Sequence, residues 1–273
     1  MNFNLVFKDK AKASQFIAKF LSKLCFLCDG SVMLGTATGS TFNEVYSELK
    51  KCRVPDNVKF IRQLDNYYSG PVNKLRNEEL PDYSYEKEIR NALCRFLPAS
   101  EFDIPNEFAL SPLEEAIRYS SSRKYASQHS KLKIQLLGIG RDGHIAFNEP
   151  GSDFWSGTHV VDLDPITIED NSRFFGGDES KVPKRAITTG LGEIMGQTDV
   201  MIFAAFGQGK QDIATEALYG VVRREIPASA LQLFDGVCVR VFDKEAAPEF
   251  GINELCCLSA EELAKKVFKT LAL

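Results

Sequence analysis

Short apolar segments alternate with amphipathic segments along most of this chain, and this alternation limits the folds open to it. Apolar runs typical of buried strands lie at 3–7, 32–34, 60–64, 132–137, 160–163, 186–189, 200–205 and 237–242. Segments with helical spacing begin at Lys10 and near Thr41, and cover 85–97, 113–129 and 209–219. Strands that alternate with helices indicate βαβ units, so we predict an α/β fold with a mostly parallel sheet.

The chain shows no internal boundary. No repeat, low-complexity tract or Pro/Ser-rich linker divides its 273 residues, so we expect one domain over 1–273. The segment 157–183 is polar and contains Gly176-Gly177, a composition typical of a mobile lid. Ser259 and Glu262 form a capping-box pattern, which predicts a closing helix with Leu263 and Val267 facing inward.

Charge and hydropathy exclude several classes of protein. The net charge is −4 with both signs interspersed, so we expect no nucleic-acid or membrane-surface partner. No apolar run approaches the roughly 20 residues of a membrane span. The N-terminus lacks a basic region followed by a long apolar stretch, so we expect no signal peptide.

The cysteines indicate a reducing compartment. Seven is an odd number in a chain too large to need disulfides, which favours a cytoplasmic location. Cys25 and Cys28 have CxxC spacing, but no second pair and no histidine pair completes a zinc site. We interpret them, and the adjacent Cys256 and Cys257, as small buried apolar residues.

The segment 138–150, GIGRDGHIAFNEP, follows an apolar strand and formally matches a dinucleotide-binding fingerprint. Gly138, Gly140 and Gly143 have the spacing, and Asp162 lies about twenty residues on. The fingerprint requires a helix that starts at the third glycine, whereas Pro150 ends this segment six residues later. We therefore expect no nicotinamide or flavin cofactor.

The same segment carries groups that transfer protons. His144 lies two residues from Asp142 and five from Glu149 within a glycine-rich loop, which suits acid–base chemistry better than core packing. No second His or Cys lies at ligand spacing, so we expect no metal. Asp65 follows a strand and precedes aromatic residues; it could be a desolvated base or an ordinary turn cap.

A phosphate site is predicted at the sequence GTATGST, residues 35–41. Gly39, Ser40 and Thr41 would offer backbone N–H groups and hydroxyls to an anion, although Ser40 or Thr41 could equally cap a helix. Arg173, in the lid segment, and Lys210, at a predicted helix start, are further candidate anion ligands. A lysine at a helix start opposes the helix dipole, which hints at a ligand.

Together these motifs resemble the glucosamine-6-phosphate deaminase (isomerase) family. GTATGST, LDNYY, GIGRDGHIAFNEPGS, NSRFF, KVPKRAITTG and PASALQL occur in the family's order over about 3–242. The resemblance implies a three-layer α/β/α sandwich with a modified Rossmann-like sheet. It implies conversion of glucosamine 6-phosphate and water to fructose 6-phosphate and ammonia, a hydrolase-type release that needs no cofactor.

The resemblance also implies roles for individual residues. Asp65 matches the base that moves a proton between carbons 2 and 1, and His144 matches the residue that opens the sugar ring, assisted by Asp142 and Glu149. The phosphate clamp corresponds to Gly39, Ser40, Thr41, Arg173 and Lys210.

Four positions depart from the family pattern. Asn66 stands where a second acid is common beside the base, which leaves any proton relay there in question. Gly157, His159 and Val161 replace basic residues of the family. The positions of His159 and Val161 belong to the effector pocket of the hexameric, allosteric members. We therefore expect a non-allosteric enzyme, either a monomer or a low-order homo-oligomer.

Other functions remain open from the sequence. The chain could act on galactosamine 6-phosphate, or it could be a hydrolase similar to 6-phosphogluconolactonase. It could also be a sugar-phosphate sensor that has lost turnover, although a pure binder would not need all four proton-transfer groups.

Overall fold

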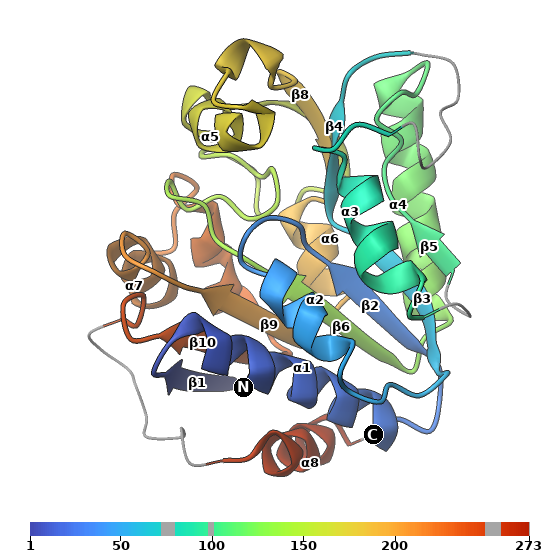
Figure 1. Cartoon of the computed structure of the whole chain (residues 1–273), viewed down its shortest axis with the longest axis vertical. Helices are drawn as coiled ribbons and strands as arrows, with labels where there is room; N and C mark the ends of the chain where they lie inside the picture. Colours follow the sequence, from blue (N-terminus) through green and yellow to red (C-terminus); the bar gives the residue numbers. More distant parts are fainter. Residues whose placement is uncertain (72–79, 98–100, 249–257, 273) are drawn as a thin grey trace.

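The computed structural model describes residues 1–71, 80–97, 101–248 and 258–272. A central sheet of parallel strands runs through the molecule in the order β1, β10, β9, β6, β2, β3, β5 (Figure 1). The strands are β1 Asn2–Phe7, β2 Val32–Thr36, β3 Val58–Gln63, β5 Glu101–Asp103, β6 Leu132–Leu137, β9 Val200–Ala205 and β10 Val237–Asp243. The predicted parallel sheet is confirmed. The short edge strand β5 was not predicted.

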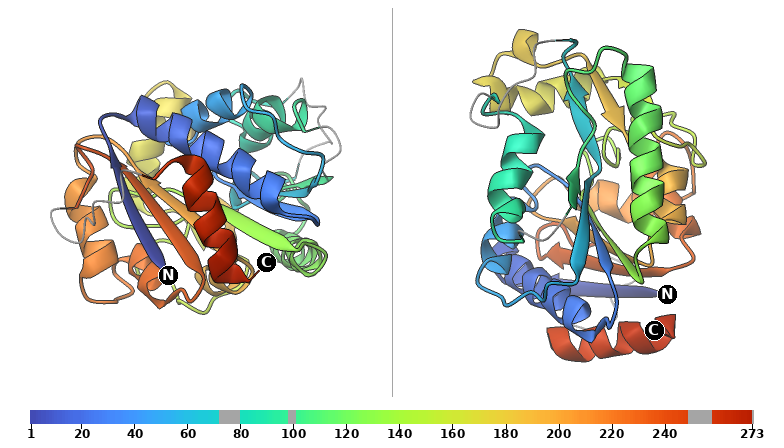
Figure 2. Two further views of the ribbon diagram at one scale, coloured as in Figure 1. Left: turned by 90° about the horizontal axis from the view of Figure 1, so that it is seen from below. Right: turned by 90° about the vertical axis from the view of Figure 1, so that its right-hand side faces the viewer.

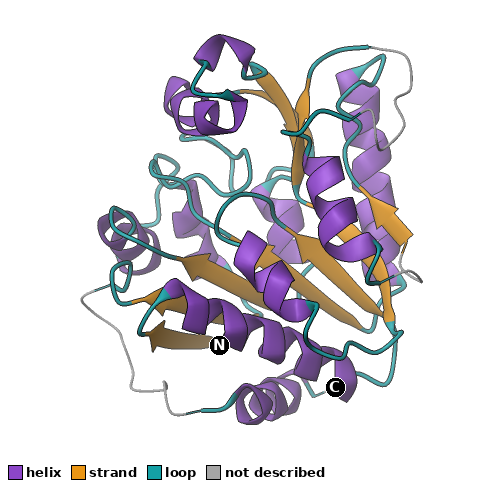
Figure 3. Ribbon diagram, viewed as in Figure 1, coloured by secondary structure: helices purple, strands orange, loops and turns teal. Residues whose placement is uncertain are grey.

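Helices cover both faces of this sheet, which gives the predicted three layers (Figures 2 and 3). One face carries α1 Lys10–Leu27, α2 Asn43–Leu49, α3 Tyr85–Ile89 and the π-helix η2 Arg90–Cys94, with α8 Ala260–Leu271 against α1. The other carries α4 Pro112–Gln128, α6 Leu191–Gly196, α7 Gln211–Tyr219 and the 3₁₀ helix η5 Pro227–Leu233. Apolar stripes explain this arrangement, since Ile17, Phe20 and Leu24 of α1 are fully buried.

A second, antiparallel sheet rises from the end of the first, and the sequence did not predict it. It consists of β4 Asp65–Tyr68, β8 Arg185–Thr188 and β7 His159–Asp162, in that order. After β3 the chain passes through Leu64 directly into β4, so Asp65 begins a strand rather than ending one. An aromatic cluster of Tyr67, Tyr85, Phe147 and Phe175 packs beneath this sheet.

The segment 157–183, expected to be a lid, contains regular structure. After β7 it forms α5 Pro165–Asn171, then the 3₁₀ turns η3 Ser172–Phe175 and η4 Glu179–Lys181. Gly176 ends η3 with a left-handed φ of 71°. Phe175 anchors this segment, because its ring lies 4.4 Å from that of Tyr83.

Several local predictions are confirmed. The capping box of Ser259 and Glu262 opens α8, and Leu263 and Val267 are fully buried. Cys25 and Cys28 are buried free thiols at the end of α1, whereas Cys256 and Cys257 lie outside the described residues. Within the described part of the chain, every helix is too short or too polar to cross a membrane.

Candidate active site

The candidate site lies where two neighbouring strands send the chain in opposite directions. β2 and β6 are paired, but the chain leaves β2 toward β3 on one side and leaves β6 toward β9 on the other. Such a switch point opens a crevice at the carboxyl ends of the strands. The two loops at this point are 37–42 and 138–150, the segments that carry the predicted phosphate and proton-transfer residues.

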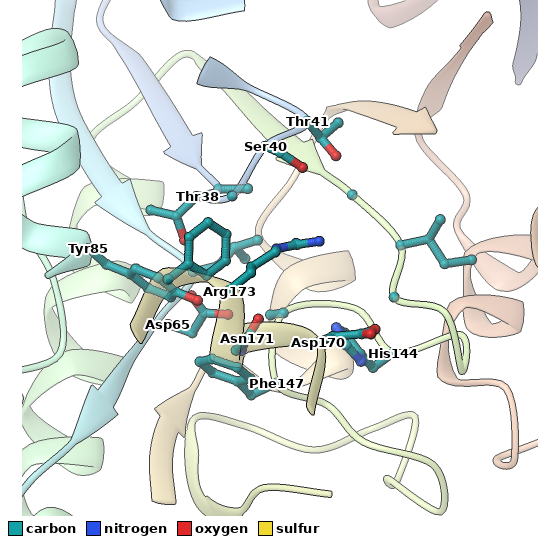
Figure 4. Close-up of a pocket in the computed structure, with 18 of the residues that line it drawn as sticks. Thr38, Ser40, Thr41, Asp65, Tyr85, His144, Phe147, Asp170, Asn171 and Arg173 are labelled. Atoms are coloured by element: carbon teal, nitrogen blue, oxygen red, sulfur yellow. The ribbon is translucent and has the colours of Figure 1, made fainter. Parts of the chain in front are cut away.

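A cavity of about 200 Å³ occupies this crevice (Figure 4). Of the predicted site residues, it is lined by Gly39, Ser40, Thr41, Asp65, His144, Arg173 and Lys210. Ser40 and Thr41 lie at one end and Asp65 and His144 at the other (Figure 4). Residues of the lining that the sequence did not single out include Thr38, Tyr85, Ala146, Phe147, Asp170 and Asn171.

Asp142 and Glu149 do not line the cavity but hold His144 from behind. Asp142 Oδ1 lies 2.7 Å from His144 Nδ1 and also accepts the backbone N–H of His144 at 3.1 Å. Glu149 Oε2 lies 3.7 Å from the same ring nitrogen. With Nδ1 held by carboxylates, Nε2 is the ring atom left for proton exchange with a ligand.

These contacts set the pKa values of the cluster. Burial lowers the pKa of His144, but the hydrogen bond and charge of Asp142, with the charge of Glu149, outweigh burial and raise it. For Asp142, burial opposes the ionised form, yet its bonds to His144 leave its pKa below the ordinary value. Burial raises the pKa of Glu149. The contacts of Asp142 and Glu149 therefore favour the protonated form of the imidazole.

The packing of His144 explains why position 140 of the apparent nucleotide fingerprint is a glycine. A Cβ at this position would lie 2.3 Å from Cε1 and Nδ1 of His144, so the imidazole packs directly over the glycine. No helix follows Gly143, whose φ is 87°. As predicted, the fingerprint lacks the helix that a dinucleotide requires. The glycines here make room for His144 instead.

The segment 157–183 reaches this cluster through Thr167, which the sequence did not indicate. The Thr167 hydroxyl donates to Glu149 Oε2 at 3.0 Å, and the backbone N–H of Asp164 donates to Glu149 Oε1 at 3.3 Å. Thr167 is 1% exposed. The orientation of Glu149 therefore depends on α5.

Asp65 lies apart from the His144 cluster. Its carboxylate is buried, with 6% of the residue exposed, and accepts a hydrogen bond from Gln63 Nε2 at 3.3 Å. Burial raises the pKa of Asp65 to about 7, although the Gln63 hydrogen bond and the charge of His144 oppose this rise. Asn66, the departure from the family pattern, donates its amide to the carbonyl of Pro105 at 2.9 Å.

At the other end of the cavity, Ser40 and Thr41 are not helix caps. The helix predicted to start near Thr41 begins at Asn43, and Phe42 is its N-cap residue, with no side-chain capping bond. The reason is a turn in which the N–H of Phe42 donates to the carbonyl of Gly39, whose φ is 90°. Both residues line the cavity, so their hydroxyls are available to a ligand.

Two cations flank this loop. Lys210 is the N-cap residue of α7, and its ammonium group donates to the carbonyl of Ile139 at 3.0 Å. Burial lowers the pKa of Lys210. The guanidinium of Arg173 lies 4.8 Å from the ring centroid of Phe174. Within the described residues, neither cation forms an ion pair, so an anionic ligand would meet two charges not yet neutralised.

The His144 cluster also bears on the metal prediction. Ligand atoms of Asp142, His144 and Glu149 lie within 4.8 Å of one another. The two carboxylates could therefore act as metal ligands in place of the second His or Cys that the sequence lacks. However, Nδ1 of His144 already lies at hydrogen-bond distance from Asp142. The arrangement suits proton transfer, and the expectation of no metal stays a prediction.

Sequence comparisons give a consistent set of relatives. Residues 11–239 match the family model described as glucosamine-6-phosphate isomerases/6-phosphogluconolactonase. A glucosamine-6-phosphate deaminase from Streptococcus uberis is 39% identical over 223 residues, which are 82% of this chain and 89% of the relative. One from Streptococcus pyogenes is 38% identical over the same shares.

Solved structures agree in fold. A monomeric glucosamine-6-phosphate deaminase superposes with a TM-score of 0.77 and 30% identity, covering 89% of this chain and 98% of the other. A 6-phosphogluconolactonase from Shewanella baltica superposes with a TM-score of 0.67, covering 89% and 97%, but is only 17% identical. The second likeness supports the fold alone.

Proposed function

The chain belongs to the family of glucosamine-6-phosphate isomerases and 6-phosphogluconolactonases, and within it we propose that the protein is a glucosamine-6-phosphate deaminase. It would convert glucosamine 6-phosphate and water to fructose 6-phosphate and ammonia. The reaction is an aldose–ketose isomerisation that ends in deamination. The description isomerase and deaminase therefore fits it better than the hydrolase class expected from the sequence.

One observation carries this proposal: a single cavity holds two separate proton-transfer groups. Asp65 lines it from β4, while His144 lines it from the loop after β6 with Asp142 and Glu149 behind. An amino-sugar isomerase needs both, because the ring must open before a proton can leave carbon 2. A lactone hydrolase has no use for the second group.

We assign ring opening to His144. Its Nε2 would take the proton from the anomeric hydroxyl as the bond between carbon 1 and the ring oxygen breaks, and would return a proton to that oxygen. Asp142 and Glu149 stabilise the imidazolium formed between these two transfers. The same two carboxylates raise the pKa of His144, which favours the imidazolium that this step forms.

We assign the isomerisation to Asp65. The carboxylate would remove the proton from carbon 2 of the open chain and deliver it to carbon 1. One proton of the amino group would pass to oxygen 1, which leaves a hydroxyl at carbon 1 and an imine at carbon 2. Water would then add to this imine and release ammonia, which gives the ketone. The pKa of about 7 makes Asp65 a stronger base than an ordinary carboxylate, and about half of the enzyme carries it ionised in neutral solution.

The opposite end of the cavity would bind the phosphate. Gly39, Ser40 and Thr41 offer backbone and hydroxyl donors, and Lys210 and Arg173 offer charge. A phosphate fixed there would hold carbons 1 and 2 in register with Asp65, so that remote binding energy lowers the barrier. No residue of this scheme requires a cofactor.

The overall organisation forms part of the same proposal. We treat residues 1–273 as one catalytic domain, in which the part of 157–183 that carries Thr167 and Arg173 closes over the bound sugar. We propose a monomer or low-order oligomer, supported by the monomeric deaminase that superposes on this chain. A cytoplasmic location is supported by the free thiols of the described cysteines.

The direct test is to incubate the purified protein with glucosamine 6-phosphate and measure ammonia and fructose 6-phosphate in parallel. We expect equal amounts of both products, and loss of both in the Asp65→Asn variant. Galactosamine 6-phosphate and 6-phosphogluconolactone serve as competing substrates. Faster turnover of either would contradict the proposed substrate, and a fully active Asp65→Asn would contradict the proposed base.

A further inference from the structure

We propose that Gln63 is a positioning residue that orients the carboxylate of Asp65 and connects it to the phosphate-binding loop. This inference rests on the proposed function, in which Asp65 is the base. Gln63 is the last residue of β3, two positions before Asp65, and is fully buried. It does not line the cavity, so it would act through its neighbours.

The orientation of the Gln63 amide is fixed from one side. Thr36 of β2 is the register partner of Gln63 in the parallel sheet, and its hydroxyl donates to Gln63 Oε1 at 2.7 Å. The opposite amide orientation would turn Oε1 toward the carboxylate of Asp65, which is repulsive. The amide therefore presents its NH₂ group, a pure donor, to the cavity side.

Both hydrogens of that NH₂ group have acceptors. Gln63 Nε2 lies 3.3 Å from Asp65 Oδ1 and 3.4 Å from Thr38 Oγ1. Thr38 lines the cavity beside Gly39 and belongs to the proposed phosphate-binding loop. One amide thus connects the base to Thr38, the residue of the phosphate-binding loop that lies on the side of Asp65 (Figure 4).

Asp65 has few other groups to stabilise its charge. Within the described chain, Gln63 is the one side chain that donates a hydrogen bond to it. His144 faces it from the loop after β6 and lowers its pKa by charge. Tyr67 on β4 and Tyr85 on α3 also lie near, but burial holds both phenols neutral. The dipole of Gln63 is therefore a main support for the ionised base, because a buried carboxylate without donors becomes protonated.

The same bridge suggests why the phosphate end matters to the chemistry. Binding of a phosphate by residues 38–41 would fix the Thr38 hydroxyl, which in turn limits the positions open to the Gln63 amide. Asp65 Oδ1 would then be held while Oδ2 remains free for the substrate proton. Gln63 would in this way link occupancy of the phosphate site to alignment of the base.

Two substitutions test this role. Gln63→Met keeps the length of the side chain but removes the donor, and Gln63→Glu keeps the shape but adds a like charge beside Asp65. We expect the acidic limb of kcat/KM to move to higher pH by about one unit in Gln63→Met, the loss expected for one hydrogen bond to a charged group. We expect a larger shift in Gln63→Glu. Glucosamine 6-phosphate titrates identically with each enzyme, so the difference reports the protein.

A titration that does not depend on turnover supplies the second measurement. The ¹³C carboxyl resonance of Asp65, assigned by its absence in Asp65→Asn, should show the same shifts in the two Gln63 variants. Gln135 is the matched control, since it is equally buried on β6 but donates to Leu136 and accepts from Arg123. Gln135→Met should lower the melting temperature without moving the acidic limb.

The outcomes separate the two proposals. Wild-type protein that releases no ammonia would overturn the proposed function, whatever Gln63 does. An active wild type whose acidic limb and Asp65 resonance stay in place in folded Gln63→Met and Gln63→Glu would overturn the role of Gln63 alone.

Discussion

Asp65 and Thr188 face each other as register partners on the antiparallel strands β4 and β8, and the hydroxyl of Thr188 accepts the backbone N–H of Phe147 at 3.1 Å. Thr188 therefore touches both halves of the site, the strand that carries Asp65 and the loop that carries His144. Asn148 adds a second link, since its amide donates to the carbonyl of Thr189 at 2.9 Å. The small sheet sets the distance between the two proton-transfer groups.

Removing the Thr188 hydroxyl should loosen this link. In Thr188→Val the buried N–H of Phe147 would lose its acceptor, which costs about 1–3 kcal/mol. We expect a lower melting temperature and a lower kcat, with KM changed less because the phosphate loop is untouched. Thr188→Ser keeps the hydroxyl and should retain most of the activity. Equal kcat in the Val and Ser variants would show that this bond does not align the site.

Gly140 offers a sharper test of the ring-opening assignment. A methyl group there would lie 2.3 Å from the imidazole of His144, so Gly140→Ala should push the ring from its place above the glycine. We expect kcat for the cyclic sugar to fall by about a hundredfold or more, as for loss of a general acid–base group. His144→Gln should have a similar effect.

The control for this prediction is Gly151→Ala. Gly151 lies in the turn after the same loop, and its Cβ would meet no atom within 4 Å, although its φ of 97° adds strain. We expect Gly151→Ala to lose stability but to keep its turnover. This result would show that backbone strain alone does not explain the loss of turnover in Gly140→Ala. Full activity in Gly140→Ala would contradict the placement of His144.

Much of the fold follows from local patterns. The strands of the main sheet other than β5, and the helix α1, were predictable because each has its own apolar pattern. Helix α8 was predictable because Ser259 and Glu262 form its capping box. The family and the three-layer fold are confirmed. Strands β7 and β8 were predicted at 160–163 and 186–189, but their separate antiparallel sheet was not. The reason is that β4 follows β3 after a single residue, Leu64, and nothing in the sequence marks the change of partner.

Some residues of the candidate site were likewise predictable from the sequence, and others were not. Asp142, His144 and Glu149 lie within eight residues of each other, so the sequence alone indicated their proximity. Thr167 and Gln63 were missed, because a threonine on a short helix and a glutamine at a strand end have no distinctive pattern. Their importance depends on contacts that only the folded chain creates, such as that between Thr167 and Glu149.

Lys210 should contribute to binding more than to the chemical step. In Lys210→Ala one charge of the proposed phosphate clamp is lost, and we expect KM to rise roughly ten- to a hundredfold, the range for a hydrogen bond to a charged group. The change in kcat should be much smaller than in His144→Gln. Lys131→Ala, which removes a lysine paired with Asp29 away from the cavity, should leave both constants unchanged. A fall in kcat with constant KM would place Lys210 in the chemistry instead.

The burial of Asp65 also makes the stability of the protein depend on pH. In the unfolded chain its pKa is near 3.8, whereas in the folded protein burial raises it to about 7. Between these values the folded protein keeps a proton that the unfolded chain has released, so the folded state binds more protons. The free energy of unfolding must therefore fall as pH rises through this range, and level off above pH 7.

Asp65→Asn removes this titration, and the variant should become more stable than the wild type as pH rises. Three pKa units correspond to about 4 kcal/mol, so the difference in unfolding free energy should grow by up to that amount between pH 4 and pH 7 and stay constant above. Urea unfolding of both proteins at half-unit steps of pH measures it. Asp29→Asn is the control, because Lys131 lowers the pKa of that exposed carboxyl and no growth is expected over this range. A difference that does not change with pH would mean that Asp65 ionises normally in the folded protein, and the base would then lack the tuning that its burial supplies.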